Sequence, residues 1–400
     1  MSYKLLSSIY YSNNIKYEEI YKARLNSEST IKFNFNIGNN PAFVVINNEI
    51  LNKIQKIYKK DKELFIFKTY IPGIALHQYA NKCLIDEIKM TNEIEGVNST
   101  RKEISDILVG NTSKKKRLYG LVKKYQLLLE EHIDLETCED IRNIYDELVL
   151  QEVTQDDPDN APDGEIFRKD GVSVLNESRE PIHRGVNPEE EIIKMLDSGL
   201  AIINSDDINK LISISIFHYL FGYIHPFYDG NGRISRFISS YLVSQELEDL
   251  VSYRIAYTIK QNLKSYYKCF KVTNDKKNKG DLTGFVIFFL DIILKSLDEL
   301  IKSLNDRREK LDFYHEKIEY LCEDEKTLTI LFILVQDTLF GECGMDRETL
   351  YRISTVGLSK IKTSLDYFES IGIVEKEKES KKFIYSVNLD KIADIQIDKA

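Results

Sequence analysis

The 400-residue sequence contains no tryptophan, only seven prolines and only five cysteines. The cysteines are odd in number and widely spaced, and none belongs to a C-x-x-C pair. This distribution argues against a disulfide framework and against a cysteine-based zinc site. We therefore expect each cysteine to be a small buried hydrophobe in a reducing, cytoplasmic compartment.

Long apolar runs are also absent. No stretch approaches the roughly 18 uncharged residues that a membrane-spanning helix needs. The opening MSYKLLSSIYYSNN lacks the apolar core and cleavage site of a signal peptide. We therefore expect no membrane partner. The formal net charge of −9 argues against non-specific coating of nucleic acid, although it leaves room for a local basic face.

Helical periodicity fills most of the chain, so the predicted fold class is mainly α. Residues 74–91 carry one apolar stripe, and Gly96 is expected to end that helix. Ser205 is expected to cap the start of a later helix. Residues 282–300 are apolar nearly all round, which predicts a buried helix. Further helices are expected at 101–110, 114–133, 135–150, 189–204, 208–224, 233–247 and 259–272.

Two regions break this pattern. Residues 154–189 hold four of the seven prolines and three glycines, which predicts a loop with one or two short strands. A loop of this length is usually functional or disordered. Near the C-terminus, three helical patterns precede two strands with a charged turn, the outline of a winged helix-turn-helix.

These changes of pattern divide the chain into four predicted parts. An N-terminal region spans 1–100 and a core spans 101–299. A strongly charged linker helix follows at 300–322, and the winged helix-turn-helix is expected at 323–400.

Residues 225–236, HPFYDGNGRISR, form the most informative run. Pro226 ends the preceding helix, and the glycine-rich turn opens a new one. Glycines here let backbone N–H groups crowd around one anion, and the helix N-terminus adds partial positive charge. The run therefore predicts an anion site.

The charged residues of this run point to phosphate chemistry. Arg233 and Arg236 lie on one side of the first helical turn, where guanidinium forks suit phosphate oxygens. Asp229 is a hard oxygen ligand for a phosphate-bridging Mg²⁺. His225 titrates near neutrality, so it can take a proton from an incoming hydroxyl.

The run resembles the signature of the Fic family, H-P-F-x-[D/E]-G-N-G-R-x-x-R, at every fixed position. The resemblance extends through most of 60–295. It includes the lead-in FHYLFGYI and, with one extra residue, a G-x-[YF]-R type element at 164–168. It implies a Fic-type helical bundle with a β-hairpin flap.

The resemblance implies a protein adenylyltransferase that moves AMP from ATP to a Ser, Thr or Tyr hydroxyl of a target protein and of itself, releasing pyrophosphate. The cofactor implied is Mg²⁺. Gly232 stands where kinase-like toxin relatives carry Lys, which favours nucleotidyl transfer. The implied roles are His225 as the base, Phe227 as the loop anchor, Asp229 as the metal ligand, Gly230, Asn231 and Gly232 as the anion nest, and Arg233 and Arg236 as the phosphate grip.

The same resemblance implies roles outside the run. Residues 172–186 would form the flap that docks the target by adding a strand. Candidates on the adenine side are Asn262 and Tyr266, although Leu263 replaces an Arg that relatives often carry. The candidate flap residues are Val172, Ser173, Val174 and Ile182.

Residues 91–96, TNEIEG, fit the family's inhibitory pattern [S/T]-x-x-x-E-[G/N]. Glu95, at a helix end, could form a bidentate pair with Arg236 and keep it from the γ-phosphate of ATP. The alternative is that Glu95 is a solvated helix-terminal acid. Self-inhibited relatives imply a homodimer, and some use this glutamate to remove AMP again.

Two alternatives to AMP transfer stay open. The fold could take another donor, because relatives transfer UMP, GMP or phosphocholine and no residue of the loop reads the base. The chain could also be a transcription regulator that binds DNA through its C-terminal module. Its predicted recognition helix carries Lys360 and Lys362 beside Asp366 and Glu369, a thin basic footprint that does not favour DNA.

Overall fold

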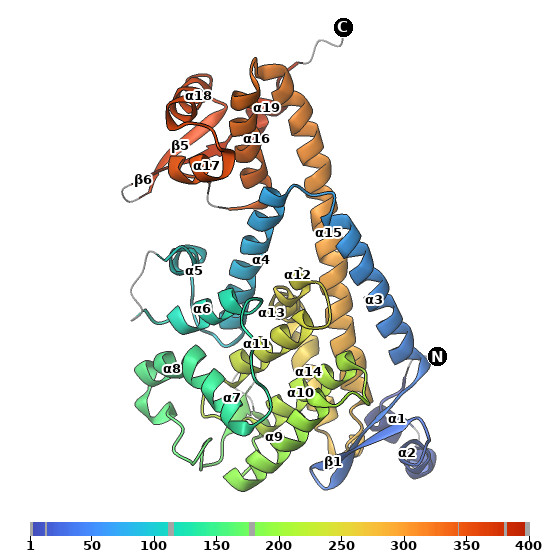
Figure 1. Cartoon of the computed structure of the whole chain (residues 1–400). Coiled ribbons are helices and arrows are strands. Elements are labelled where there is room, and N and C mark those ends of the chain that lie inside the picture. Colours follow the sequence, from blue (N-terminus) through green and yellow to red (C-terminus); the bar gives the residue numbers. More distant parts are fainter. Residues whose placement is uncertain are drawn as a thin grey trace. The chain divides into compact units, whose positions relative to one another are not determined.

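The computed structural model describes residues 3–12, 14–110, 116–175, 181–342, 344–379 and 382–396. It is mainly helical, as predicted, and its few strands form two-stranded sheets (Figure 1). The chain divides into two compact units. Unit 1 comprises Met1–Lys62 and Leu84–Asp298, and unit 2 comprises Glu63–Cys83 and Glu299–Ala400.

Three helices pass from one unit to the other along the chain: α3 (Asn48–Lys68), α4 (Gly73–Ile94) and α15 (Thr283–Leu321). The other elements of unit 1 are α1 (Leu6–Ser12), η1 (Asn14–Lys16), α2 (Tyr17–Leu25), β1 (Thr30–Ile37), β2 (Asn40–Val45), α5 (Arg101–Leu108), α6 (Tyr119–Leu127), α7 (Cys138–Tyr145), the π-helix η2 (Asp146–Leu150), α8 (Gln151–Asp156), η3 (Pro158–Asn160), β3 (Ser173–Leu175), β4 (Pro181–Arg184), α9 (Glu189–Asn204), α10 (Lys210–Ile224), α11 (Asn231–Ser244), α12 (Asp249–Ser252), α13 (Ile255–Gln261), α14 (Leu263–Thr273) and η4 (Lys276–Asn278).

The core of unit 1 is built around α10, which is buried on nearly all sides because its sequence is apolar all round. α9 and α11 pack against it (Figure 1). The first half of α15 is also core, with Phe285, Phe289 and Ile293 fully buried, which confirms the prediction for this stretch. None of the described helices combines the length and apolarity needed to cross a membrane.

Helix ends follow local chemistry, with one prediction confirmed and one wrong. Gly96 ends α4 in the left-handed conformation (φ 75°), which glycine adopts without steric strain. Ser205, predicted to start a helix, instead follows the end of α9. Asn209 caps α10, and its side chain accepts from the backbone N–H of Leu211.

Unit 2 contains α16 (Glu325–Phe340), α17 (Arg347–Ser354), α18 (Leu358–Ser370), β5 (Val374–Glu379), β6 (Lys382–Val387) and α19 (Leu389–Ala393). β5 and β6 pair antiparallel, with Val374 opposite Val387. The three helices and the hairpin appear in the predicted order. The winged-helix assignment stays a prediction.

The predicted linker helix at 300–322 is not a separate element. Residues 300–321 continue α15 without a break, because no proline or glycine interrupts the helical sequence there. The predicted part boundaries stay predictions, while the two compact units divide the chain within α3, α4 and α15.

Lys360 of the predicted recognition helix, and two lysines of the β5–β6 hairpin, form ion pairs inside unit 2. Lys360 pairs with Asp324 at 2.8 Å, and Lys376 pairs with Glu369 at 3.3 Å. Lys382 contacts two further carboxylates. These pairs reduce the charge available to a phosphate backbone, so they do not favour DNA binding.

Unit 2 also holds a carboxylate with an unpartnered oxygen. Asp337 on α16 is 2% exposed, and its Oδ2 lacks a hydrogen-bond partner among the described residues. Burial raises the pKa of Asp337 to about 7. Because this value exceeds the unfolded one, the stabilising effect of the bound proton is lost as pH rises toward and through 7.

We therefore expect Asp337→Asn to stabilise the protein at pH 8 by on the order of 2 kcal/mol and much less at pH 5. Thermal unfolding of the full chain between pH 5 and 8 measures the difference. Asp366→Asn, on the exposed face of α18, is the matched control. Equal pH dependence in the two variants would contradict the expectation.

Candidate functional site

Residues 225–236 form the loop between α10 and the first turn of α11. His225 ends α10 with a left-handed backbone (φ 55°), and Gly230 precedes α11 with φ 82°. A positive φ is costly for most residues and free for glycine. The Asn231 side chain holds the loop, since its Nδ2 donates to the Phe227 carbonyl and its Oδ1 accepts from the Phe227 N–H (2.8 and 2.9 Å).

Phe227 anchors the loop from inside. It is fully buried and stacks on Tyr145 with ring centroids 3.7 Å apart. Phe167, from the 164–168 element, meets it edge-on at 5.4 Å. Since the Asn231 side chain is occupied with Phe227, Asn231 can offer an anion its backbone N–H but not its amide.

Arg168, from the same element, supports the loop because its side chain donates hydrogen bonds to backbone carbonyls. It is fully buried and donates to four carbonyl oxygens, including that of His225 (2.8 Å) and that of Val186 at the base of the flap (2.7 Å). One guanidinium therefore connects the loop of residues 225–236 to the chain that follows the β3–β4 hairpin.

A carboxylate lies at the start of α11, where the sequence predicts an anion nest. A Cβ placed on Gly232 would overlap Glu95 Oε1 and lie 2.9 Å from Arg236 Nη1. Glu95 thus lies against the Gly232 backbone, where helix N–H groups point outward. Glycine at 232 leaves the space that this carboxylate fills.

Arg236 is 1% exposed and donates hydrogen bonds to Thr91 of α4 and to Glu95 just after it. Its Nε donates to Thr91 Oγ1 (2.8 Å), and its Nη2 donates to the Thr91 carbonyl (3.0 Å) and to Glu95 Oε1 (2.8 Å). The predicted Glu95–Arg236 pair is therefore present, but through one carboxylate oxygen and not as a bidentate pair.

The electrostatics of Glu95 follow from this pair. Burial alone would raise its pKa, but the Arg236 guanidinium, with Arg233 and His225 nearby, holds the pKa of Glu95 below its usual range. Glu95 is therefore an anion at neutral pH. Its side chain is 27% exposed, so it can leave the nest without crossing the core.

A buried carboxylate on α4, Glu87, fixes this helix to the core. Glu87 is fully buried and accepts from the backbone N–H groups of Ala256 and Tyr257, at 2.7 and 3.0 Å. Glu87 and Thr91 lie four residues apart on one face of α4, and Glu95 follows four residues later, just past the end of the helix.

His225 is half-buried and lies within electrostatic range of Glu95. Burial lowers the pKa of His225 to about 4, with Arg168 and His183 acting in the same direction and Glu95 opposing them. The imidazole is therefore neutral at physiological pH and able to accept a proton.

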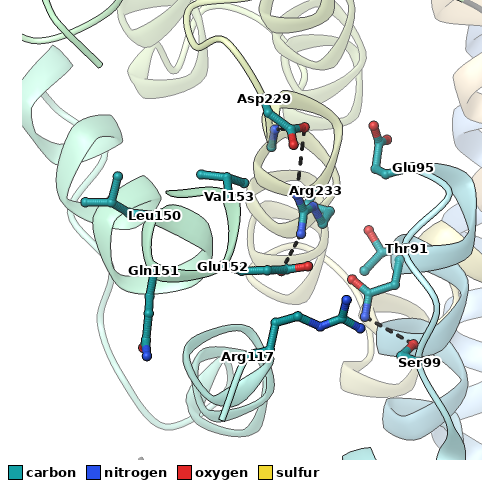
Figure 2. A network of polar contacts seen from close by, with 12 residues as sticks. Thr91, Glu95, Ser99, Arg117, Leu150, Gln151, Glu152, Val153, Asp229 and Arg233 are labelled. Atoms are coloured by element: carbon teal, nitrogen blue, oxygen red, sulfur yellow. Dashed lines mark hydrogen bonds and ion pairs between the residues drawn. The ribbon is translucent and has the colours of Figure 1, made fainter. Parts of the chain in front are cut away.

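Arg233 lies between two carboxylates (Figure 2). Its Nη1 donates to Glu152 Oε2 at 2.5 Å, and its Nη2 is 3.8 Å from Asp229 Oδ1. Burial raises the pKa of Glu152, although Arg233 and Arg117 oppose that effect.

The residues fit a phosphate-bridging metal at Asp229. Its side chain is 44% exposed, while its Oδ1 accepts from the Gly230 N–H at 2.5 Å. The described residues contain no cluster of three or more metal-ligating side chains. Mg²⁺ commonly binds one or two carboxylates together with substrate phosphates, and Asp229 would supply one such carboxylate.

The flap is a short hairpin. β3 and β4 pair antiparallel, with Ser173 opposite Arg184 and Val174 opposite His183. The Gly185 N–H donates to the Val172 carbonyl (2.9 Å), which continues the pairing. For Val174 and Ile182 the structure describes the backbone, and residues 176–180 of the predicted flap lie outside the described residues.

The two adenine-side candidates differ. Tyr266 is buried and shares a 2.8 Å hydrogen bond with His218 Nε2, and burial raises its pKa against the opposing field of Arg236. Asn262 donates to the Thr258 carbonyl and accepts from Lys295 Nζ, so its amide is occupied within the chain. Both assignments stay predictions.

The sequence identified the motif and Glu95 but missed the partners that hold them. Thr91 appeared only as part of a pattern, and Arg168 only as part of a resemblance. Glu152 had no signal, because it is an ordinary acid 81 positions before Arg233 in the chain. A pairing at that separation becomes visible only in three dimensions.

Comparison with known proteins matches this site to one family. The Fic/DOC family model matches residues 135–243. The chain is 34% identical over 98 residues to the protein adenylyltransferase Fic of Drosophila grimshawi and to that of Drosophila mojavensis. Each match covers 24% of this chain, which spans 18% of the length of these relatives.

Solved structures agree on the fold. A Fic family protein from Desulfovibrio desulfuricans G20 aligns with a TM-score of 0.54 over 86% of this chain and 97% of that one, at 17% identity. Fic-1 from C. elegans aligns with a TM-score of 0.50 over 75% of this chain and 81% of that one, also at 17% identity. This confirms the predicted Fic-type helical fold.

Proposed function

We propose that this chain is a protein adenylyltransferase that moves AMP from ATP to a hydroxyl of a target protein and of itself. The observation that supports the proposal is the Glu95 carboxylate, which lies against the Gly232 backbone and accepts from Arg236. The relatives named protein adenylyltransferase support the same reaction class. A carboxylate at the N-terminus of α11 supports an anion site there, because this end of a helix attracts negative charge.

The reaction requires little covalent work from the protein. His225 accepts the proton of the target hydroxyl, whose oxygen attacks the α-phosphorus of ATP. The bond between that phosphorus and the bridging oxygen of the β-phosphate breaks, and pyrophosphate leaves with the electron pair. Arg233, Arg236 and the first N–H groups of α11 stabilise the phosphate charge. Mg²⁺ held by Asp229 would neutralise the α- and β-phosphate oxygens.

We further propose that Glu95 inhibits this reaction in cis. Its carboxylate occupies Arg236 and the space over Gly232, so the γ-phosphate of ATP meets a negative charge instead of a guanidinium. A nucleotide that binds under these conditions is misplaced at its α-phosphorus. Inhibition and removal of AMP by the same glutamate stay alternatives for the same site.

The test uses the Glu95→Gly chain with Mg²⁺ and ATP labelled at either the α- or the γ-phosphate. We expect label on protein from the α-position only. Label from the γ-position alone would mean phosphorylation and would overturn the proposal. Comparing ATP with UTP, GTP and CDP-choline in a lysate of the source cell identifies the donor, and mass measurement in solution tests the predicted homodimer.

A further inference from the structure

Glu152 and Glu95 hold the two arginines of the motif in different ways. The Glu95 side chain is 27% exposed and follows the last residue of α4. The Glu152 side chain is 1% exposed and lies in α8, so it cannot leave Arg233 without local unfolding. One arginine therefore has a displaceable partner and the other a permanent one.

Glu152 reaches Arg233 because one face of the α7–η2–α8 segment follows the motif. Three residues on this face, four and then three positions apart in the sequence, each contact one residue of the motif. The motif residues they contact are three positions apart. The pairs are Tyr145 with Phe227, Val149 with Gly230 and Glu152 with Arg233. The ion pair is thus set by packing on both sides of it.

Stability gives no sufficient reason for this ion pair. Glu152 Oε1 and Arg233 Nε have no hydrogen-bond partner among the described residues, although both atoms are buried. A buried ion pair with unmet hydrogen bonds gains little over an apolar pair of the same volume, because desolvation offsets the attraction.

The position of Asp229 suggests what the pair does. Asp229 Oδ1 lies 3.8 Å from Arg233 Nη2, an ion pair that is roughly 1 Å too long for a hydrogen bond. Glu152 approaches the guanidinium from the opposite end and bonds Nη1 (Figure 2). Without that second carboxylate, Asp229 would be the nearest anion left to Arg233.

We propose that Glu152 is a positioning residue that holds the Arg233 guanidinium back from Asp229 and so keeps the Asp229 carboxylate available to the metal on the nucleotide. This inference rests on the proposed function, in which Asp229 carries that metal. Glu152 does not touch the nucleotide and acts through Arg233 alone.

The test measures metal binding in the full chain, without turnover. In the Glu95→Gly background, Mn²⁺ is titrated by electron paramagnetic resonance in the presence of α,β-methylene-ATP. We expect Glu152→Gln to raise the half-saturating Mn²⁺ concentration about tenfold, because the charge-assisted partner of Arg233 is lost. Affinity for the nucleotide without metal should change less than about twofold, since the phosphate grip is still present.

The matched control is Glu147→Gln, the same change in the same segment, at an exposed residue that pairs with Lys124. Its Mn²⁺ titration should match the parent. Equal titrations for Glu152→Gln and Glu147→Gln overturn the inference, as does a proportional loss of metal-free nucleotide binding. If the Glu95→Gly chain itself binds no metal–nucleotide complex, the proposed function fails as well.

A second variant tests the inference if the Glu152→Gln chain does not fold. Glu152→Gln combined with Arg233→Met removes both charges and leaves Asp229 without a competing cation. We expect this pair to bind Mn²⁺ within about twofold of the Arg233→Met single variant, because Glu152 then has no charge to position. A lower affinity in the pair overturns the inference.

Discussion

Glu95→Gly should transfer AMP to itself and to its target at least about tenfold faster than the parent chain. The substitution frees Arg236 Nη2 and empties the space over Gly232. A charge-assisted hydrogen bond contributes about 1.5–3 kcal/mol, and each 1.4 kcal/mol is a factor of ten in rate or affinity. Incorporation of α-labelled ATP measures the increase.

The same substitution should lower stability, because Arg236 is 1% exposed and loses its carboxylate. Thr91 still accepts two hydrogen bonds from Arg236, so we expect a loss of about 1–3 kcal/mol and not unfolding. ATP should therefore raise the melting temperature of the variant more than that of the parent, since phosphates replace the missing charge.

Glu93→Gly is the matched control for both effects. Glu93 lies two residues earlier, and its carboxylate pairs with Lys89 on the surface of α4. It should stay as inactive as the parent. Equal labelling of parent and Glu95→Gly chains would show that Glu95 is a helix-terminal acid without an inhibitory role.

His225→Ala, made in the Glu95→Gly background, should lose transfer by roughly 10²–10⁴-fold, the usual contribution of a general base. Binding of ATP should persist, because the nest, Arg233 and Arg236 are unchanged. Labelling with α-labelled ATP and equilibrium nucleotide binding separate the two effects. His132→Ala, at a histidine 83% exposed on the surface, is the control.

The pH profile sharpens this prediction. Since burial lowers the pKa of His225 to about 4, its imidazole is neutral above about pH 5, and transfer should be flat on its account from pH 6 to 8. Glu95 raises the pKa of His225, so its removal should not move the acid limb of the pH profile to a higher pH than in the parent. An acid limb near the ordinary histidine value of about 6.5, or a His225→Ala chain that stays active, would contradict this role.

The sequence by itself determined the local parts of this protein. The turn at residues 225–236 is specified by contiguous residues: a proline that ends one helix, glycines that allow φ 82° at Gly230, and the helix that opens behind them. Gly96 could be predicted for the same reason, because a left-handed helix end is a property of one residue. Ser205 shows the limit, since Asn209 competed for the same role four residues later and stood directly before the helix.

The tertiary structure alone decided which charge holds which arginine. Arg236 is 141 positions from Glu95 and Arg233 is 81 positions from Glu152, and no local rule links residues at such separations. The Glu95 pair could be anticipated from a family resemblance, whereas the Glu152 pair could not. The two glutamates also differ in burial, since the Glu95 side chain is 27% exposed and that of Glu152 is 1% exposed. Side-chain packing in the tertiary structure decides this difference.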